Sequence, residues 1–274
     1  MKNVRSLGSR PGWDGHLLLC YGEESQRRAG VAAWVRRGLE LEAKILYTQP
    51  ADDLPDRSLP GLLGDETDAL EALDRGQIQV IPADPSTYDP AFIENVVDGA
   101  LSEGYPAVRW AGVASTAWEV IPRSSHEIAE RATDELCRSR PLSVLCQYPA
   151  PECSDAVGYL IRSHGGGLRE QRFQAAPVEG GLALAGELDA TNQRILRSLL
   201  TTATTAPERD PFVLDLSWLD FLDLPGARAL LFGTLDYRDA GGQVRLETPQ
   251  PHVAQLIHLL GLDQEPGIQV GETP

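Results

Sequence analysis

Short apolar runs alternate with longer segments of helical period along this chain, and this alternation is the feature that most constrains the fold. The run HLLLCY at 16–21 precedes a segment at 29–42 whose apolar residues recur on one helical face, and the run KILYT follows at 44–48. Runs of this length are typical of buried strands. A strand, a helix and a second strand in this order predict two parallel strands joined by a crossover helix.

The same alternation continues to residue 163. Further strands are predicted at 78–81, 107–113 and 143–148. Helices are predicted at 67–74, 92–101, 124–138 and 154–163. Ser124 or Ser125 is expected to cap the helix at 124–138, since serine is a favoured N-cap residue. This order predicts an α/β domain with a mostly parallel sheet and helices on both faces.

A run of three glycines, Gly165-Gly166-Gly167, ends this alternation and marks a domain boundary. The strands predicted beyond it are at 172–178, 182–185, 212–216 and 244–247. The helices predicted beyond it are at 191–200, 225–237 and 252–260. We therefore expect two domains, 1–168 and 169–274, each long enough to bury its own core.

The balance of charge excludes several classes of partner. The 274 residues carry 40 Asp and Glu against 24 Lys and Arg, a net charge of −16. A chain this acidic is a poor candidate for binding nucleic acid or an anionic membrane. Residues 1–14 lack the apolar core of a signal peptide, and no apolar run approaches the roughly 18 residues of a membrane span. We therefore expect a cytoplasmic protein.

The four cysteines, Cys20, Cys137, Cys146 and Cys153, show no CxxC spacing. Disulfides are rare in a reducing cytoplasm, and without such a spacing nothing in the sequence indicates one. We expect reduced thiols that pack in the core as small apolar groups.

Three C-terminal segments carry a family pattern: GELDATNQRILRSLL, FVLDLSWLDFLDLPGARALL and YRDAGGQVRLETPQPHVAQLIHLLGL. Together they resemble a STAS domain, the α/β fold of bacterial anti-sigma-factor antagonists, over residues 172–270. The resemblance implies that the start of one helix contacts an anti-sigma factor of the serine-kinase type. The residues implied in partner binding are Asp189, Asp223, Leu224, Pro225 and Gly226.

The chain departs from that family at the helix start. Asp223 suits an N-cap and Pro225 suits a first helical turn. The family's phosphoacceptor serine directly follows the Asp, and Leu224 stands in its place. Leucine has no hydroxyl, so the phosphoacceptor position is lost and no phosphate can be added there. Two interpretations stay open: partner binding without phosphorylation, or a STAS fold retained for dimerisation or intramolecular contact.

A second pattern covers residues 16–164. Its segments are HLLLCYGEESQRRAGVAAWVRRGLELEAKILYT, GQIQVIPADPSTYDP, EGYPAVRWAG and PLSVLCQYP. They resemble the MEDS domain, a sensory module of methanogen and methylotroph regulators, which is itself similar to the RecA/KaiC-type ATPase fold. The resemblance implies a RecA/KaiC-like, mostly parallel sheet and a role in sensing small organic molecules.

The turn GEESQRR at 22–28 stands where a P-loop would lie in that fold. It lacks GK[ST] and the glycines that hold phosphates, and its two carboxylates would repel them. The sequence also contains no GxSxG, HExxH or GxGxxG motif. We therefore expect no enzymatic activity and no cofactor.

Ligands bind open α/β sheets at the carboxyl ends of the strands. The residues on or beside predicted strands that are candidates for ligand binding are His16, Cys20, Tyr21, Glu23, Trp110, Cys146 and Tyr148. His16, Cys20 and Cys146 could instead form a soft metal site or a reactive site. Such residues more often fill a core, and none of the other four histidines stands at a metal-like sequence spacing from a cysteine, so no metal is expected.

These observations predict a non-catalytic signalling regulator. A MEDS-like sensor would control a STAS output that binds an anti-sigma factor without serine phosphorylation, and the response would be a change in transcription, such as a stress response. The alternative is a small-molecule receptor whose STAS domain serves only dimerisation or intramolecular contact. An enzyme would require nucleotide turnover, which the turn at 22–28 does not support. A homodimer is compatible with the first two interpretations.

Overall fold

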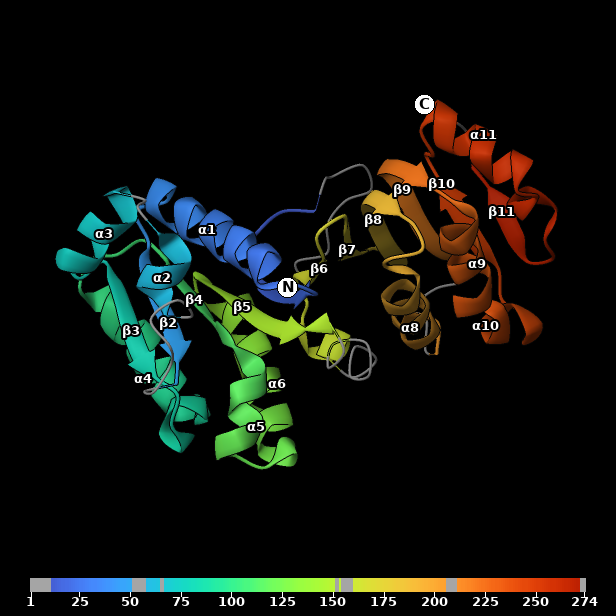
Figure 1. Cartoon of the computed structure of the whole chain (residues 1–274). Coiled ribbons are helices and arrows are strands. Elements are labelled where there is room, and N and C mark those ends of the chain that lie inside the picture. The colour runs from blue at the N-terminus through green and yellow to red at the C-terminus, as the bar shows by residue number, and fades with distance from the viewer. Residues whose placement is uncertain are drawn as a thin grey trace. The chain divides into compact units, whose positions relative to one another are not determined.

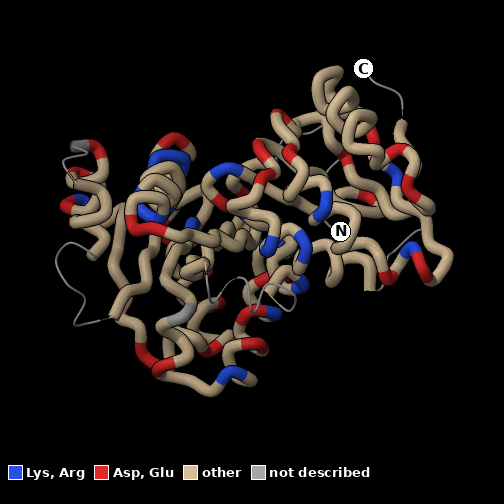
Figure 2. Tube along the Cα trace, turned by 45° about the vertical axis from the view of Figure 1, so that its right-hand side comes forward, with Lys and Arg blue, Asp and Glu red and all other residues tan. Residues whose placement is uncertain are grey.

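The computed structural model describes residues 11–50, 58–64, 67–150, 153, 160–205 and 211–271. The chain divides into two compact units, a first unit at 13–152 and a second unit at 153–274 to which the described residues 11 and 12 also belong (Figure 1). Asp and Glu are distributed over helices and loops of both units and are interspersed with Lys and Arg (Figure 2). No helix among the described residues combines the length and the apolarity that crossing a bilayer requires.

Parallel strands in the order β1-β5-β4-β2-β3 form the sheet of the first unit. These strands are β1 (His16–Tyr21), β2 (Lys44–Gln49), β3 (Ile78–Pro82), β4 (Val108–Val113) and β5 (Leu142–Pro149). Most of the residues of β1, β2, β4 and β5 are buried. Burial on both faces explains why these strands stand in the sequence as continuous apolar runs. The predicted mostly parallel α/β fold is confirmed.

Helices cover both faces of this sheet (Figure 1). One face carries α1 (Glu24–Glu40), α2 (Leu59–Leu63) and α3 (Thr67–Asp74). The opposite face carries α4 (Pro90–Ser102), α5 (Ala117–Val120), α6 (Arg123–Ser139) and the 3-10 turns η1 (Pro85–Tyr88) and η2 (Ala114–Thr116). Strand side chains alternate between the two faces. Leu17 and Tyr47 therefore join Trp34 of α1 in one apolar core, and their even-numbered neighbours face the other way.

Helix ends depart from the sequence prediction where capping decides them. α1 begins at Glu24 because Glu23 and Gln26 form a capping box, which satisfies backbone N–H groups at the helix start. α6 follows Pro122, which has no side-chain cap, so the predicted cap by Ser124 or Ser125 is wrong. Most of the helix predicted at 154–163 lies outside the described residues.

The second unit has a mixed sheet in the order β6-β7-β8-β9-β10-β11. Its strands are β6 (Gly167–Arg169), β7 (Phe173–Val178), β8 (Gly181–Leu188), β9 (Phe212–Leu222), β10 (Val244–Glu247) and β11 (Ile268–Val270). β7 pairs antiparallel with β6 and β8, and the pairs from β8 to β11 are parallel. The helical segments are η3 (Ile161–Ser163), α8 (Gln193–Ala203), α9 (Leu224–Gly233), α10 (Leu235–Asp239), α11 (Pro251–Leu259) and η4 (Leu262–Gln264).

β9 continues past the predicted end at residue 216. Trp218 pairs with Ala185 of β8, and Phe221 pairs with Glu187, with register shifts between these pairs. β9 therefore ends directly before Asp223, the residue that caps α9. α9 lies close to β8 at Gly226, where an added Cβ would stand 2.4 Å from the backbone oxygen of Leu188.

The cysteines contradict one expectation. Cys20 and Cys153 are disulfide-bonded, whereas Cys137 and Cys146 are free thiols. The expectation of four reduced thiols is therefore wrong for two of them. Disulfide partners are set by the three-dimensional fold, so the lack of a CxxC spacing does not exclude a bond.

Candidate functional site

β1, β4 and β5 place three of the predicted residues on the sheet face covered by α6. In the strand register, His16 and Trp110 both stand level with Val144. Cys146 follows two residues after Val144 on β5, so it faces the same side. Trp110 is held there by a hydrogen bond of 2.8 Å from its Nε1 to Thr48 Oγ1. The sheet thus presents an imidazole and a thiol to the helix above it.

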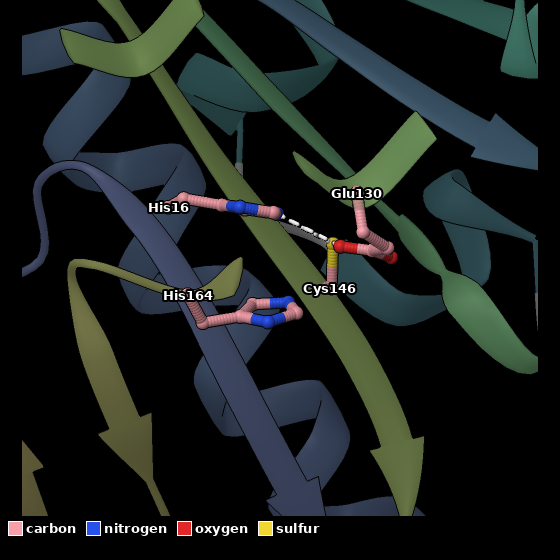
Figure 3. A group of neighbouring side chains, drawn as sticks. All are labelled: His16, Glu130, Cys146 and His164. Carbon is pink, nitrogen blue, oxygen red and sulfur yellow. Dashed lines mark hydrogen bonds and ion pairs between the residues drawn. The ribbon is translucent and has the colours of Figure 1, made fainter. Parts of the chain in front are cut away.

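α6 places the carboxylate of Glu130 next to these two groups (Figure 3). Glu130 Oε2 lies 3.2 Å from His16 Nε2 and 3.8 Å from Cys146 Sγ, and His16 Nε2 lies 3.3 Å from Cys146 Sγ. The other oxygen, Glu130 Oε1, lies 2.9 Å from His126 Nε2 and accepts a 3.3 Å hydrogen bond from the hydroxyl of Tyr148. The carboxylate is therefore engaged on both oxygens while its side chain is only 6% exposed.

A second acidic residue of α6, Asp134, lies near the other ring nitrogen of His16. Asp134 Oδ1 lies 3.7 Å from His16 Nδ1, and Asp134 Oδ2 accepts a 2.6 Å hydrogen bond from Arg138. Figure 3 also labels His164, a residue of the second unit whose Nδ1 lies 2.6 Å from the carbonyl oxygen of Leu160. Within the first unit, His16, Glu130 and Cys146 form the centre of what we call the His–Glu–Cys cluster.

Sequence reasoning singled out His16 and Cys146 but missed their partners on α6. His126, Glu130 and Asp134 follow one another at intervals of four residues, so they share one face of the helix. All three are buried, although the helix as a whole is rich in charge. The four-residue spacing was the available signal, but it does not show which face of a charged helix meets the sheet.

Burial and neighbouring negative charge act in opposite directions on the pKa of His16 and in the same direction on the pKa of Cys146. Burial alone would lower the pKa of His16, but its interactions with Cys146, Asp134 and Glu130 raise that pKa well above the ordinary value. Burial, helped by the neighbouring charge of Glu130, raises the pKa of the Cys146 thiol to about 11. The Cys146 thiol is therefore neutral at neutral pH, and the raised pKa of His16 favours the cationic imidazole, which balances part of the buried negative charge.

A cavity of about 80 Å³ opens beside the cluster. It is bounded by β2, β4 and β5 on the sheet side and by η1, α4 and α6 on the helix side, and most of its lining is apolar. The polar residues in the lining are Thr48, Thr87, Tyr88, Trp110, His126, Glu130, Thr133 and Cys146. About 10–15 Å³ of such volume suffices for one water molecule, so this cavity has room for a small organic molecule.

The structure brings four of the seven predicted ligand-binding residues to this place. Trp110 and Cys146 line the cavity, and His16 and Tyr148 reach the cluster through Glu130. The other three residues are placed differently: Cys20 is disulfide-bonded, Tyr21 ends β1, and Glu23 is the N-cap of α1. None of these three residues lines the cavity.

The turn at 22–28 has its own buried cation, which sequence reasoning also missed. Arg27 donates hydrogen bonds to Gln147 Oε1 at 2.9 Å and to the hydroxyl of Tyr47 at 2.8 Å. It also pairs with Glu24 at 2.7 Å. The guanidinium thus ties the start of α1 to the carboxyl ends of β2 and β5.

In the second unit, the start of α9 combines structural contacts with exposed apolar groups. Asp223 Oδ1 accepts a 2.7 Å hydrogen bond from the N–H of Gly226, which confirms the predicted cap. Asp223 Oδ2 accepts from the N–H of Ala190 at 3.3 Å, so the same side chain also ties α9 to the loop after β8. Leu224 is 45% exposed and Phe221 is 43% exposed. The apolar side chains, rather than the carboxylate, are available at this surface.

Asp189 is held by its own loop. Its carboxylate accepts hydrogen bonds from the N–H and the hydroxyl of Thr191 and lies 3.3 Å from Arg172. Burial acts to raise the pKa of Asp189, but the Thr191 hydrogen bonds and Arg172 outweigh it and lower the pKa. A lowered pKa stabilises the fold above the unfolded value of about 3.9 and loses that effect as the pH falls through the folded value.

Thr191→Ala is expected to raise the pKa of Asp189 toward that unfolded value, because it removes the hydroxyl that donates to the carboxylate. The measurement is an NMR pH titration of the Asp189 carboxyl carbon in both proteins. Thr201→Ala, at an exposed threonine near the end of α8, is the matched control and should leave the titration unchanged. An equally low pKa in both variants would show that Thr191 does not lower it.

Comparison with known families identifies both units. A family model described as "MEDS: MEthanogen/methylotroph, DcmR Sensory domain" matches residues 15–164, more than half of the chain. A second model, described as "Mlab, STAS domain", matches residues 171–270. Both resemblances drawn from the sequence are thereby confirmed.

Individual relatives match part of the chain. The chain is 38% identical over 79 residues to the Anti-sigma-F factor antagonist RsfA of Mycobacterium tuberculosis, in the strains CDC 1551 / Oshkosh and ATCC 25618 / H37Rv. These matches cover 28% of this chain and 60% of the relatives' length. Among solved structures, the anti-sigma factor antagonist SpoIIAA in its unphosphorylated form matches with 22% identity and a TM-score of 0.30, over 36% of this chain and 88% of that chain.

Proposed function

The chain belongs to the MEDS family and carries a STAS domain after the MEDS domain, and from this premise we propose that it is a regulator acting on an anti-sigma factor. The STAS domain binds an anti-sigma factor of the serine-kinase type, and a small organic ligand in the cavity of the MEDS domain controls that binding. The anti-sigma-F factor antagonists among the curated relatives support the class of partner. The response is a change in transcription.

The exposed apolar pair at the start of α9 carries this proposal. Leu224 stands at the position of the family's phosphoacceptor, directly after the capping Asp223. With Phe221 it offers an apolar surface of the kind found in the core of protein interfaces. A phosphate at a helix start would add about −1.5 to −2 charges, and leucine cannot accept one. The STAS domain therefore binds its partner without a phosphorylation switch, and control comes from the other domain.

The regulator is non-catalytic and acts in the cytoplasm. Its turn at 22–28 lacks the glycines and the GK[ST] that hold a nucleotide. The turn carries two carboxylates, Glu23 and Glu24, which would repel phosphates. The guanidinium of Arg27 is already hydrogen-bonded to Gln147 and Tyr47. These contacts support a structural role for the turn at 22–28, which stands where a P-loop would lie.

Leu224→Glu is expected to reduce capture of the anti-sigma factor by about tenfold or more, because an unpaired charge would be buried at the contact, and each 1.4 kcal/mol is a factor of ten. The tagged full-length protein is purified from its own cells, and the bound anti-sigma factor is quantified by mass spectrometry. Leu259→Glu is the matched control, since Leu259 of α11 is 70% exposed. Equal capture by the wild type and by Leu224→Glu would contradict the proposal that Leu224 contacts the anti-sigma factor.

The cavity gives specific support to a second function, a small-molecule receptor whose STAS domain serves only dimerisation or intramolecular contact. Its apolar lining and single cluster of polar groups are typical of ligand sites. The same purification separates the two functions. Recovery of a bound small molecule with no anti-sigma factor, under any growth condition, would favour the receptor.

A further inference from the structure

We propose that the His–Glu–Cys cluster of the first unit is a zinc site, with His16 Nε2, Cys146 Sγ and Glu130 Oε2 as protein ligands (Figure 3). The ligand atoms of these three residues lie within 4.8 Å of one another. They come from β1, β5 and α6, so they converge from three elements rather than from one loop. This proposal is independent of the proposed function.

The separations of the three atoms match those around a tetrahedral zinc ion. Zinc bond lengths of about 2.0–2.3 Å give separations of about 3.3 Å between N and O, about 3.5 Å between S and O and about 3.6 Å between N and S. The cluster has 3.2 Å, 3.8 Å and 3.3 Å for the same pairs. Each separation is within about 0.3 Å of its ideal value, so an ion fits with small side-chain shifts.

Each ligand residue has the outer contacts that metal sites use. A metal-binding histidine usually donates its second ring N–H to a carboxylate. Asp134 Oδ1 stands 3.7 Å from His16 Nδ1, an ion-pair distance from which a small shift gives this hydrogen bond, and Arg138 holds Asp134. The second oxygen of Glu130 is held by His126 and Tyr148, which leaves Oε2 directed at His16 and Cys146. The arrangement therefore fixes which atom of each ligand is presented.

The chemistry of the donors selects the kind of ion. An imidazole, a thiol and a carboxylate suit zinc better than magnesium or calcium, which prefer oxygen ligands alone. Zinc binds the thiolate form of cysteine and the neutral form of histidine, so its binding releases protons, and the ion then supplies positive charge beside Glu130 and Asp134. Three protein ligands leave one position of a four-coordinate ion for a further group.

The test is metal binding by the full-length chain. Protein purified without chelator or added thiol is analysed for zinc by mass spectrometry, and metal-free protein is then titrated with Co²⁺, whose thiolate charge-transfer band reports a Co–S bond. Cys146→Ser removes the proposed ligand. Cys137→Ser is the matched control, because it removes the other free thiol, also from the first unit. Asp134→Asn keeps all three ligands and weakens the support of His16 together with the ion pair to Arg138.

We expect about one zinc per chain and a thiolate–cobalt band in the wild type and in Cys137→Ser, and loss of both in Cys146→Ser. Asp134→Asn is expected to weaken cobalt binding about 10- to 100-fold. A wild type without the band, or a Cys146→Ser protein that keeps it, would overturn the site. If Cys146→Ser does not fold by circular dichroism, Asp134→Asn decides: unchanged cobalt affinity would overturn the proposal.

Discussion

Replacing Glu130 with alanine is expected to lower the free energy of unfolding of the first unit by about 3–5 kcal/mol, the cost of removing one partner from a buried charge pair. Its carboxylate lies against His126 and His16 and accepts a hydrogen bond from Tyr148. All of these groups are buried or nearly so, and removing the carboxylate leaves buried polar partners without the charge that they contact. Urea unfolding in the presence of a chelator measures the effect without any metal contribution.

The matched control lies on the same helix. Glu135 is 70% exposed and pairs with Arg138 at 2.7 Å. Exposed pairs of this kind contribute about 0.2–1 kcal/mol, so Glu135→Ala should change the free energy of unfolding by less than about 1 kcal/mol. Similar effects of the two substitutions would mean that the cluster contributes nothing beyond an ordinary surface ion pair.

Gly226→Ala is expected to lower the free energy of unfolding of the second unit by about 3 kcal/mol, the upper end of the usual cost of overpacking. The added Cβ would stand 2.4 Å from the carbonyl oxygen of Leu188 and 2.8 Å from its carbonyl carbon. Both are backbone atoms of β8, so α9 would have to move as a whole. Hydrogen exchange of the β8 and α9 amides measures the loss separately from the first unit.

Leu224→Ala is the control at the same helix start. Leu224 is exposed, so its truncation should change the free energy of unfolding by no more than about 0.5 kcal/mol. Equal protection of the amides in Gly226→Ala and Leu224→Ala would refute the close packing of α9 on β8. The pair also separates two roles within the predicted partner-binding residues: Gly226 shapes the domain, and Leu224 is available to a partner.

The strands were predictable because burial on both faces leaves a continuous apolar run, as in HLLLCY at 16–21. β9 beyond Leu216 was not, because Ser217 and Asp220 interrupt the run and suggest a loop. Tertiary pairing with β8 overrides that local signal. The disulfide-bonded cysteines escaped prediction for a related reason, since no local pattern marks them.

The candidate site was only half visible in the sequence. His16 and Cys146 could be selected by residue type and strand position. The 3.3 Å contact between their side chains depends on the sheet register, which the sequence does not give. Glu130 stands in the segment SSHEIAERATDELCRSR, where charged residues are common and most would be solvated. Only the packing of α6 on the sheet shows that one stripe of this helix is buried.

That stripe has a consequence for how α6 is positioned. His126, Glu130, Asp134 and Arg138 recur at intervals of four residues, about 6 Å along the axis. A slide of the helix by that distance would bring Asp134 to the position of Glu130 in one direction and His126 there in the other. Only the observed position places both acidic groups against His16, so the order of charges along the helix contributes to selecting that position. In that position the small side chains of Ala129 and Thr133 line the cavity beside Glu130, so the position that pairs the charges also leaves the cavity open.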